Sequence, residues 1–562
     1  MAEPLKLKLG RGTIEVPWSR LDRAIESVAP QWAARRLQAR VGHALTAHMG
    51  GWNGASTSRR SLAGWVPQPS DADSDTLVSL PMLRGRSSDL VRNAPVAGGA
   101  INTTVTKVVG TGLSLQATPD ATALRLTADE ADAWARDVET KFAAWWETTD
   151  CDITRTQTGH ALTDLVLRSE CERGDVFAVL ANAKWSRGPV KLAVQLVEAD
   201  RCCNPDRKPD TDRMVAGIEL DDAGAPVRYH FASANPYTRS GTLRGGARIT
   251  WSSVAAFGQR TGRRNVLHVF QRRRVGQTRG VPMLAPVIEP LKQLERYTEA
   301  ELMAAVVSGM FTVFIQAEGP STVMPSALTG ANQAPAGGNS GADKWDGKLG
   351  NGLVVELGKN ESINTANPGR PNSQFDPFVQ AIIRQIGLLL EIPFEVLVKH
   401  YSSSYSAARA ALLDAWSYFR VRRDRLATQF CQPVFEAWMD EAVAVGYVRA
   451  PGYFADPLVR RAWLLAEWTG DGPGAIDPLK EVQSADARVR LGISTREAES
   501  LAHDGRRLGP KLRQLAREEA AMAGLQMSGP AAGGMPGGAP GQQPGDDNPG
   551  DGSNNDGGNG QP

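Results

Sequence analysis

A long run of helical periodicity constrains this 562-residue chain more than any other feature. Apolar residues recur at helical spacing from Ala407 to about Val445, in a stripe made of Ala408, Leu412, Trp416, Phe419, Leu426, Phe430, Val434 and Trp438. At about 1.5 Å per residue, one helix of this length extends about 60 Å. Pro433 lies inside it and predicts a kink. Such a helix needs packing partners along its length, from its own chain and from neighbouring subunits.

Two shorter helices precede this one and bracket an insert of different composition. The apolar spacing predicts helices over residues 285–310 and 374–391. Between them, residues 311–369 have a middle rich in Gly, Pro, Ser and Asn, with β-like ends at 311–316 and 353–357. This pattern predicts an inserted module carried between two helices.

The N-terminal half alternates between helical and strand-like patterns. Helices are expected at 88–109, 128–147 and 158–173, and strands at 176–181, 191–197, 214–220, 227–231 and 265–270. The second helix carries Trp134, Phe142, Trp145 and Trp146 on one stripe. The fold class is therefore α+β.

The two ends of the chain differ from this centre. Residues 32–40 read as a basic amphipathic helix, and 50–75 as loop. Residues 463–515 read as helical, and Ser494 to Glu497 has the form of a capping box. Beyond Ser528 the chain has almost no apolar residues, so we expect a disordered tail.

Composition limits the possible partners. The formal net charge is +2, whereas proteins that grip duplex DNA tightly carry a clear basic excess. Five cysteines without framework spacing indicate a reducing compartment and no disulfide scaffold. The most apolar stretch, residues 302–315, is too short to span a bilayer, and no secretory signal is evident, so no membrane partner is expected.

Enzymatic interpretations have little support in the sequence. Glu170, Glu172 and Asp175 could suggest a metal-dependent nuclease, but exposed acids at a helix end explain them better. The histidines share no ligand spacing, and Ser402 to Ser404 lack the glycines of a nucleophile elbow. No Walker motif occurs. We therefore expect no catalytic residue, no metal site and no cofactor.

The stretch Leu90 to Gln116, LVRNAPVAGGAINTTVTKVVGTGLSLQ, reads as a helix of small residues that stops at Gly110-Thr111-Gly112. It closely resembles the signature "RN.P...GAI......VVGTGL.LQ" of lambda-type phage portal proteins. Further matching pieces follow in the expected order: Glu170-Cys-Glu-Arg-Gly174-Asp175, Glu198-Ala-Asp200-Arg, Gly280-Val-Pro-Met-Leu-Ala-Pro-Val287, Glu391-Ile-Pro-Phe-Glu395 and Ser404-Tyr-Ser406-Ala-Ala-Arg409. The resemblance covers about 80–450.

The resemblance implies a portal fold that assembles as a ring of about twelve copies at one capsid vertex. The implied parts are an N-terminal arm (1–80), an α+β wing (81–280), a stem helix (281–310), a clip (311–372), a second stem helix (373–392), a tunnel loop (393–406), a long kinked helix (407–446), a helical crown (447–527) and the tail (528–562). The implied partners are double-stranded DNA in the channel, the terminase large subunit, the major capsid or scaffold protein and a head-completion protein. The location would be the virion, with assembly in the host cytoplasm.

Two groups of residues are candidates for function within this scheme. The loop residues Lys399, His400, Ser402, Ser403, Ser404 and Ser406 offer hydroxyls and one or two cations for weak phosphate contact in the channel, although a capped loop packed on its own helix explains them equally well. A basic run with an acid inside it favours inter-subunit ion pairs over a DNA patch, and it gives the candidate interface residues Arg409, Arg420, Arg422, Arg423, Asp424 and Arg425.

Two other functions remain open from the sequence. One is a capsid-associated nuclease or protease, which cleavage of DNA or peptide by the purified chain would support. The other is a different head–tail connector ring, although such adaptors are usually much shorter than 562 residues.

Overall fold

The computed structural model describes residues 5–9, 12–16, 25, 27, 29–48, 60–62, 64–237, 249–309, 313–317, 361–365, 374–401, 405–472, 478–505 and 508–524. The chain divides into two units, Met1–Asp75 and Thr76–Pro562. The first unit contains an antiparallel hairpin of β1 (Leu5–Leu9) and β2 (Gly12–Val16), which the sequence did not predict. It also contains α2 (Pro30–His48), which confirms the basic helix. The short helix α3 (Ala72–Thr76) follows.

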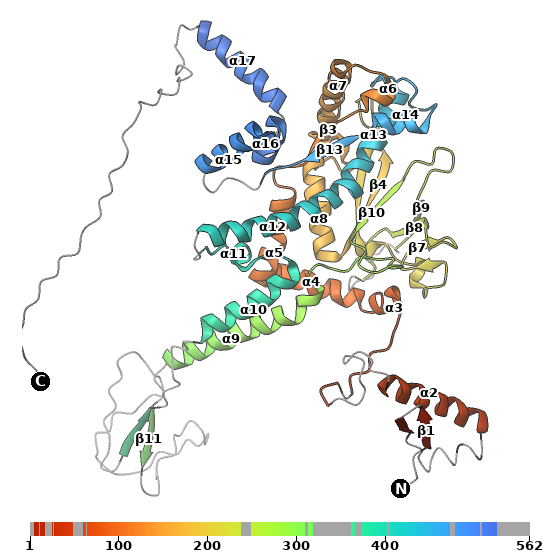
Figure 1. Ribbon diagram of the computed structural model, residues 1–562, viewed down its shortest axis with the longest axis vertical. Helices are drawn as coiled ribbons and strands as arrows, with labels where there is room; N and C mark the ends of the chain where they lie inside the picture. Colours follow the sequence, from red (N-terminus) through yellow and green to blue (C-terminus); the bar gives the residue numbers. More distant parts are fainter. Residues whose placement is uncertain are drawn as a thin grey trace, which may run out of the picture. The chain divides into compact units, whose positions relative to one another are not determined.

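In the second unit, helices and sheets form a mixed α and β core (Figure 1). The helices up to residue 173 are α4 (Leu80–Asn93), α5 (Pro95–Val108), α6 (Ala121–Leu124), α7 (Ala128–Trp146) and α8 (Gly159–Arg173). The single helix predicted over 88–109 is wrong, because the chain breaks at Ala94, which has an extended ψ of 114°. Proline disfavours the helical conformation in the residue before it, and Pro95 then begins the second helix.

Two sheets support this core. The first has the strand order β10 (Val266–Phe270), β4 (Asp175–Asn182), β5 (Leu192–Glu198), and it is antiparallel throughout. The second has the order β6 (Met214–Val215), β7 (Ile218–Leu220), β8 (Pro226–Ala232), β9 (Trp251–Ala255). The strand predicted over 214–220 is in fact two strands, since Ala216 and Gly217 turn with φ of 46° and 86°. A separate pair joins β3 (Ser114–Ala117) to β13 (Ala466–Thr469).

The small residues of α5 are explained by its position in the centre of the core. Ala97, Ala100 and Ile101 are fully buried, and a Cβ on Gly98 would lie 2.9 Å from the carbonyl oxygen of Val91 in α4. Only small side chains allow helices to approach this closely.

The turn after α5 confirms the predicted helix stop. Gly110 and Gly112 have positive φ, and Thr111 binds the carboxylate of Asp471 through its N–H (2.9 Å) and hydroxyl (3.0 Å). A Cβ on Gly112 would lie 2.3 Å from Nδ1 of His160. Both glycines are therefore required by close neighbours as well as by backbone conformation.

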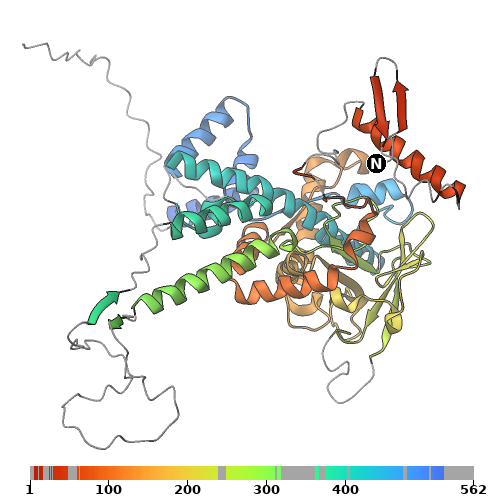
Figure 2. The same cartoon turned by 90° about the horizontal axis from the view of Figure 1, so that it is seen from below.

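The two helices that bracket the insert lie side by side. They are α9 (Ile288–Gly309) and α10 (Phe375–Leu390), and the ring of Tyr297 packs on Phe375 and Phe378 with centroids 5.6 and 5.0 Å apart. α9 starts beside α4 and extends away from the core (Figure 2). The insert between them contains an antiparallel pair, β11 (Val313–Ala317) and β12 (Glu361–Thr365). The strand predicted at 353–357 lies outside the described residues.

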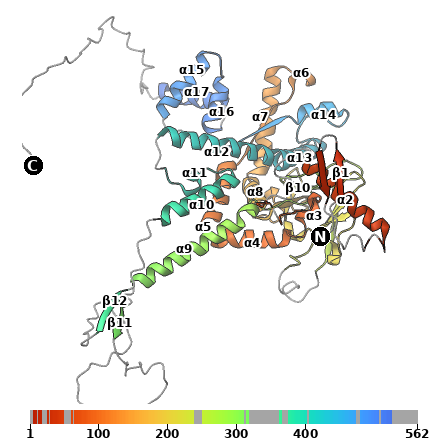
Figure 3. The ribbon, with the colours of Figure 1, turned by 60° about the horizontal axis from the view of Figure 1, so that its bottom comes forward.

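The long helix occupies the predicted range. α12 (Tyr405–Leu426) and α13 (Gln432–Ala444) follow one another, joined by a π-helical turn at Ala427–Cys431 (Figure 3). The discontinuity expected at Pro433 takes this form: the N–H of Gln432 donates to the carbonyl of Ala427, five residues back. Proline cannot donate to the preceding turn, and a π turn is one way to accommodate that loss.

Aromatic side chains of α7 pack against α13. Phe142 in α7 contacts the rings of Trp145, Trp146, Phe435, Trp438 and Trp468, with centroids 5.3–6.0 Å apart. The stripe predicted on α7 thus meets the stripe predicted on the long helix, and this contact forms much of the core.

The C-terminal helices are α14 (Pro457–Trp463), α15 (Pro478–Arg490), α16 (Arg496–Asp504) and α17 (Leu508–Gly524). The capping box predicted at Ser494 is wrong, because Thr495 is the N-cap and accepts from the N–H of Ala498, and an alanine at this position has no side-chain acceptor to complete a box. The tail beyond Ser528 lies outside the described residues.

Candidate functional site

A buried network of charges lies where α8 ends and β4 begins. Asp175, fully buried, accepts from Arg84 (2.7 Å) and from Nε of Arg279 (2.6 Å). Its Oδ2 also lies 3.2 Å from Nε2 of His268 and 3.2 Å from the backbone N–H of Gly280. Antiparallel pairing explains the placement, since β10 sets His268 opposite Phe177, two residues after Asp175. We call this set, together with Arg173 and Asp200, the Asp175 network.

The network joins segments that are distant in sequence. Arg84 also reaches Asp200 (3.4 Å), which pairs with Arg173 at 2.7 Å. Arg279 donates to three backbone carbonyls, those of Ala199 (2.7 Å), Cys202 (2.9 Å) and Ala216 (2.7 Å). Because a guanidinium has five donors in a fixed plane, one buried side chain can fix several loops at once.

The charge states follow from these contacts. Burial acts to raise the pKa of Asp175, but the guanidiniums of Arg279 and Arg84 outweigh it and hold that pKa well below its usual range. Burial lowers the pKa of His268, whose ring is stacked between Phe177 and Phe270 at 4.3 Å from each. Asp175 is therefore an anion and His268 neutral near pH 7.

Two glycines allow the backbones around Asp175 to touch. A Cβ on Gly280 would lie 2.0 Å from the carbonyl oxygen of Gly174, and a Cβ on Gly174 would lie 2.5 Å from that of Gly280. Gly174 also has a φ of 94°. The matching pieces at 170–175, 198–201 and 280–287 thus meet at one place, just before α9 begins.

The prediction that the acids Glu170, Glu172 and Asp175 are exposed is wrong. Asp175 and Glu170 are buried, and Glu172 accepts a hydrogen bond of 2.6 Å from Ser88. Within the described residues, no three His, Cys, Asp or Glu side chains are placed to hold a metal ion. Sequence reasoning missed Arg84, His268 and Arg279, and the only available signal was that the flanking motifs keep a fixed order.

The candidate interface arginines separate into two kinds. Arg422 is 5 % exposed and forms an ion pair with Glu170 of α8, while its second nitrogen donates to the Tyr418 hydroxyl (3.0 Å). The prediction that Arg422 pairs with a neighbouring subunit is therefore wrong, because its guanidinium is buried inside its own chain. Arg423 donates to backbone carbonyls of its own chain, those of Val108 (2.8 Å), Lys107 and Asp471.

The other four lie closer to solvent. Arg420 and Asp424 are exposed on α12, and Arg425 is half-buried. Arg409 pairs with Glu481 of α15 at 2.8 Å, which ties the long helix to the C-terminal helices. Arg420 and Asp424 thus remain available to a partner chain.

The predicted loop after α10 is partly helical. Residues Phe394–Val398 form α11, so the loop expected from 393 begins only at Lys399, whose φ of 56° ends that helix. Lys399 and His400 are exposed, and the backbone N–H of His400 donates to the carbonyl of Glu395 at 3.2 Å. Ser402, Ser403 and Ser404 and the side chain of Ser406 lie outside the described residues.

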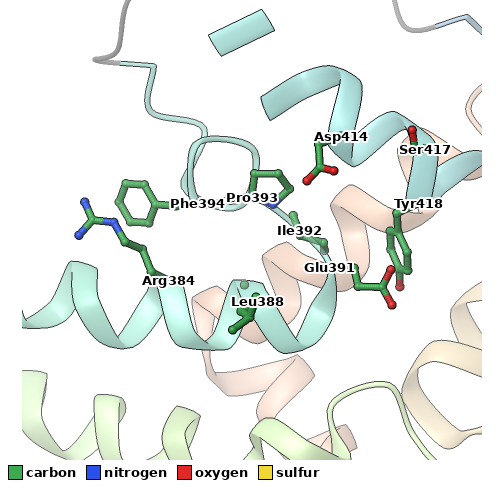
Figure 4. Close-up of a pocket in the computed structure, with 10 residues that line it drawn as sticks. Arg384, Leu388, Glu391, Ile392, Pro393, Phe394, Asp414, Ser417 and Tyr418 are labelled. Atoms are coloured by element: carbon green, nitrogen blue, oxygen red, sulfur yellow. The ribbon is translucent and has the colours of Figure 1, made fainter. Parts of the chain in front are cut away.

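A groove of about 480 Å³ lies between the end of α10, the start of α11 and the exposed side of α12 (Figure 4). We call it the α10–α12 groove. It is lined by Arg384, Gly387, Leu388, Glu391, Ile392, Pro393, Phe394, Asp414, Ser417 and Tyr418. The guanidinium of Arg384 lies over the Phe394 ring, 4.9 Å from its centroid. Leu388 is 80 % exposed.

In the part of the chain that the structure describes, no helix is both long enough and apolar enough to cross a membrane.

Comparison with known proteins identifies the family. Portal protein B of Escherichia phage lambda is 29 % identical over 477 residues, which cover 81 % of this chain and 86 % of that protein. The portal protein of Escherichia phage N15 is 29 % identical over 457 residues, covering 78 % and 84 %. A chain from a structure titled "Neck of native GTA particle computed with C12 symmetry" aligns with a TM-score of 0.38 and 12 % identity, over 74 % of this chain and 92 % of that one. The model of the lambda family of phage portal proteins matches residues 58–423, more than half of the sequence, and the chain therefore belongs to that family.

Proposed function

We propose that copies of this chain close into a ring at one vertex of a phage capsid, and that double-stranded DNA passes through the ring during packaging and ejection. The family match over residues 58–423 carries this proposal. The pairing of α9 with α10, with β11 and β12 between them and the long α12–α13 rod after them, supports it. Such elongated helices with exposed apolar side chains are suited to packing between copies.

The parts of the chain would divide the work of the ring. We propose the following assignment: residues 1–80 as an arm, 81–280 as the wing, 281–310 and 373–392 as stem helices, 311–372 as the clip, 393–406 as the tunnel loop, 407–446 as the bracing helix, 447–527 as the crown and 528–562 as a tail. The Asp175 network then fixes the wing to the start of the first stem helix, because Arg279 and Gly280 precede α9 by less than ten residues.

A DNA conduit must not hold the duplex tightly, since each neutralised phosphate adds to affinity. The net charge of +2 fits a channel of balanced sign. The exposed Lys399 and His400, with Ser402, Ser403, Ser404 and Ser406 beside them in sequence, would give weak and transient phosphate contacts. Terminase, capsid or scaffold protein and a head-completion protein would bind the outer surfaces of the ring.

Negative-stain electron microscopy of the purified full-length chain tests the proposal. The expected particle is a turbine-shaped ring with a central hole. A chain that stays monomeric at the concentrations and salt used for capsid assembly would contradict it, as would cleavage of DNA or peptide as its main activity.

The channel contact has its own test in filled heads. Replacing Lys399 by Glu should alter DNA retention, whereas Lys208→Glu, an exposed reversal within residues 81–280, should not. Equal packaging and retention in both variants would remove Lys399 from the channel wall.

A further inference from the structure

The α10–α12 groove contains two carboxylates that the described residues leave unpaired. Among the described residues, no hydrogen bond or ion pair reaches the carboxylate of Glu391 or of Asp414. Figure 4 shows Asp414 above Pro393, and Glu391 turned toward Tyr418. Arg384, the one cation of the lining, is occupied by the Phe394 ring and by Gln380, with which it shares a 2.9 Å hydrogen bond.

The apolar part of the groove is equally uncovered. α10 is amphipathic: Asp376, Gln380 and Arg384 follow one another at four-residue spacing and are linked by hydrogen bonds along one face, and Leu388 is the next residue of that face. Its inner face is buried through Ile383, Ile386 and Leu390, yet Leu388 and Leu389 are 80 % and 56 % exposed. An exposed apolar surface rimmed by charge is characteristic of a protein–protein contact.

The complementary group stands at the other end of α11. Lys399 ends this helix, its ammonium has no partner among the described residues, and Val398 and Tyr401 beside it are 43 % and 50 % exposed. The α10–α12 groove, which includes Phe394 at the start of α11, is therefore acidic and apolar. The surface around Lys399, at the other end of α11, is basic and apolar. We call residues 398–401 the α11 corner.

We propose that in the ring the α10–α12 groove of each copy receives the α11 corner of the next copy, with the Lys399 ammonium held between the carboxylates of Glu391 and Asp414. The occupant is thus a second copy of this chain. The inference rests on the proposed ring, which requires every copy to offer two different, matching surfaces.

Simple geometry supports contact at this level of the ring. If one helix of about 10 Å diameter per copy lined a ring of about twelve copies, the circumference would be about 120 Å and neighbouring helices would touch. α11 rises about 8 Å over its five residues, which is close to the spacing of about 10 Å between copies, so an α11 that lies along the ring would reach from one neighbour to the other.

The pairing would also adjust the charge of the channel. About a dozen unpaired lysines at one level would attract the DNA backbone strongly. An ammonium has three donors, so Lys399 can bind a carboxylate of the next copy and still contact a passing phosphate. The carboxylates would keep that contact weak.

Cysteine cross-linking of the full-length chain tests the contact directly. A variant with both Asp414→Cys and Lys399→Cys should form, under mild oxidation, a ladder of disulfide-linked oligomers, since each copy offers one cysteine to each neighbour. The five native cysteines are buried, so the two single variants should stay monomeric on a denaturing gel. Dimers without higher bands would indicate a symmetric contact and overturn the proposal, as would the absence of cross-links in assembled rings.

Charge reversal gives an independent measurement. Lys399→Glu, or Glu391→Lys with Asp414→Lys, should raise the protein concentration needed for half-assembly by about tenfold. Combining all three changes should bring the half-assembly concentration most of the way back to that of the wild type. The control Asp132→Lys reverses an exposed charge on α7 and should leave this concentration unchanged. Circular dichroism of the unassembled chains controls for folding.

The outcomes separate the two proposals. Rings that form equally in all variants, with no ladder, overturn this contact and leave the portal function standing. A wild-type chain that never forms rings overturns both. A groove that binds a purified head-completion protein in place of the α11 corner assigns it to a different partner and overturns the inference.

Discussion

The Asp175 network and the α10–α12 groove use the same kinds of side chain in opposite ways. In the network every carboxylate has a guanidinium of its own chain, and Asp175 and Arg279 are almost completely buried. In the groove two carboxylates and an apolar helix face lie open, without a partner in the described part of the chain. Charges that are paired within the chain hold its fold, whereas charges left open at a groove are available for assembly.

The largest effect should come from removing the centre of the network. Asp175→Asn leaves the buried Arg279 without its anion and Arg84 with only its 3.4 Å contact to Asp200, and we expect it to lower the free energy of unfolding by about 3–5 kcal/mol. Urea unfolding followed by tryptophan fluorescence measures this. Asp222→Asn is the control, because its pair with Arg213 is highly exposed and should contribute less than about 1 kcal/mol. If Asp175→Asn and Asp222→Asn lowered the unfolding free energy by similarly small amounts, the buried pairs of the network would not stabilise the fold more than exposed pairs do.

Arg422 tests a second buried pair. Arg422→Met leaves Glu170 buried and unpaired, and should cost about 3 kcal/mol of stability. Replacing Glu170 by Leu in the same chain should recover most of that loss, since an apolar pair needs no compensation. A double variant as unstable as the single one would show that packing, and not charge, dominates at this site.

Gly280→Ala addresses the backbone contact beside the network. The added Cβ would lie 2.0 Å from a backbone oxygen, and we expect a loss of about 1–3 kcal/mol or more, measured as above. Gly85→Ala is the matched control in α4, where no atom lies within 4 Å and alanine should stabilise the helix by about 0.5–1 kcal/mol. If Gly280→Ala behaved like this control, the close approach would be unimportant.

The network should also make stability depend on pH. Burial lowers the pKa of His268, so the unfolded chain takes up a proton near pH 6.5 while the folded chain does not. Stability is therefore full above about pH 6.5 and falls as the pH drops. The lowered pKa of Asp175 acts in the same direction below about pH 4. In urea unfolding, His268→Gln should reduce the difference in unfolding free energy between pH 7.5 and pH 5.5. If that difference stayed the same, His268 would not be the source of the pH dependence.

The smallest effect should come from the groove. Glu391→Lys and Asp414→Lys should change the unfolding free energy of the unassembled chain by no more than about 0.5 kcal/mol, because neither carboxylate contacts a charge among the residues that the structure describes. A destabilisation near that of Asp175→Asn would mean that these acids support the fold after all.

The sequence predicted the elements whose pattern is long. The stripe from Ala408 to Trp438 and the aromatic stripe on α7 both form the core, since a periodicity repeated over many turns averages out local exceptions. α11 was missed because five residues are too few for a periodic signal. The breaks at Ala94 and at Ala216-Gly217 depend on single residues, which window-based patterns do not resolve.

The charged residues were harder to place. Arg84 and Asp175 are 91 residues apart, and nothing local marks either as buried, so the acids at 170–175 were expected to be exposed. Arg422 was assigned to an interface for a similar reason: helical spacing gives the direction of a side chain, but not which direction is inward.

The π turn at Ala427–Cys431 lets α12 and α13 direct their side chains toward different parts of the core. One additional residue in a turn rotates everything after it by roughly 100° about the axis. Ahead of the turn Arg422 can therefore face Glu170, and after it Trp438 can face Phe142. Deleting one residue there would convert the turn to regular α-helix and force the rod to give up one of these two attachments.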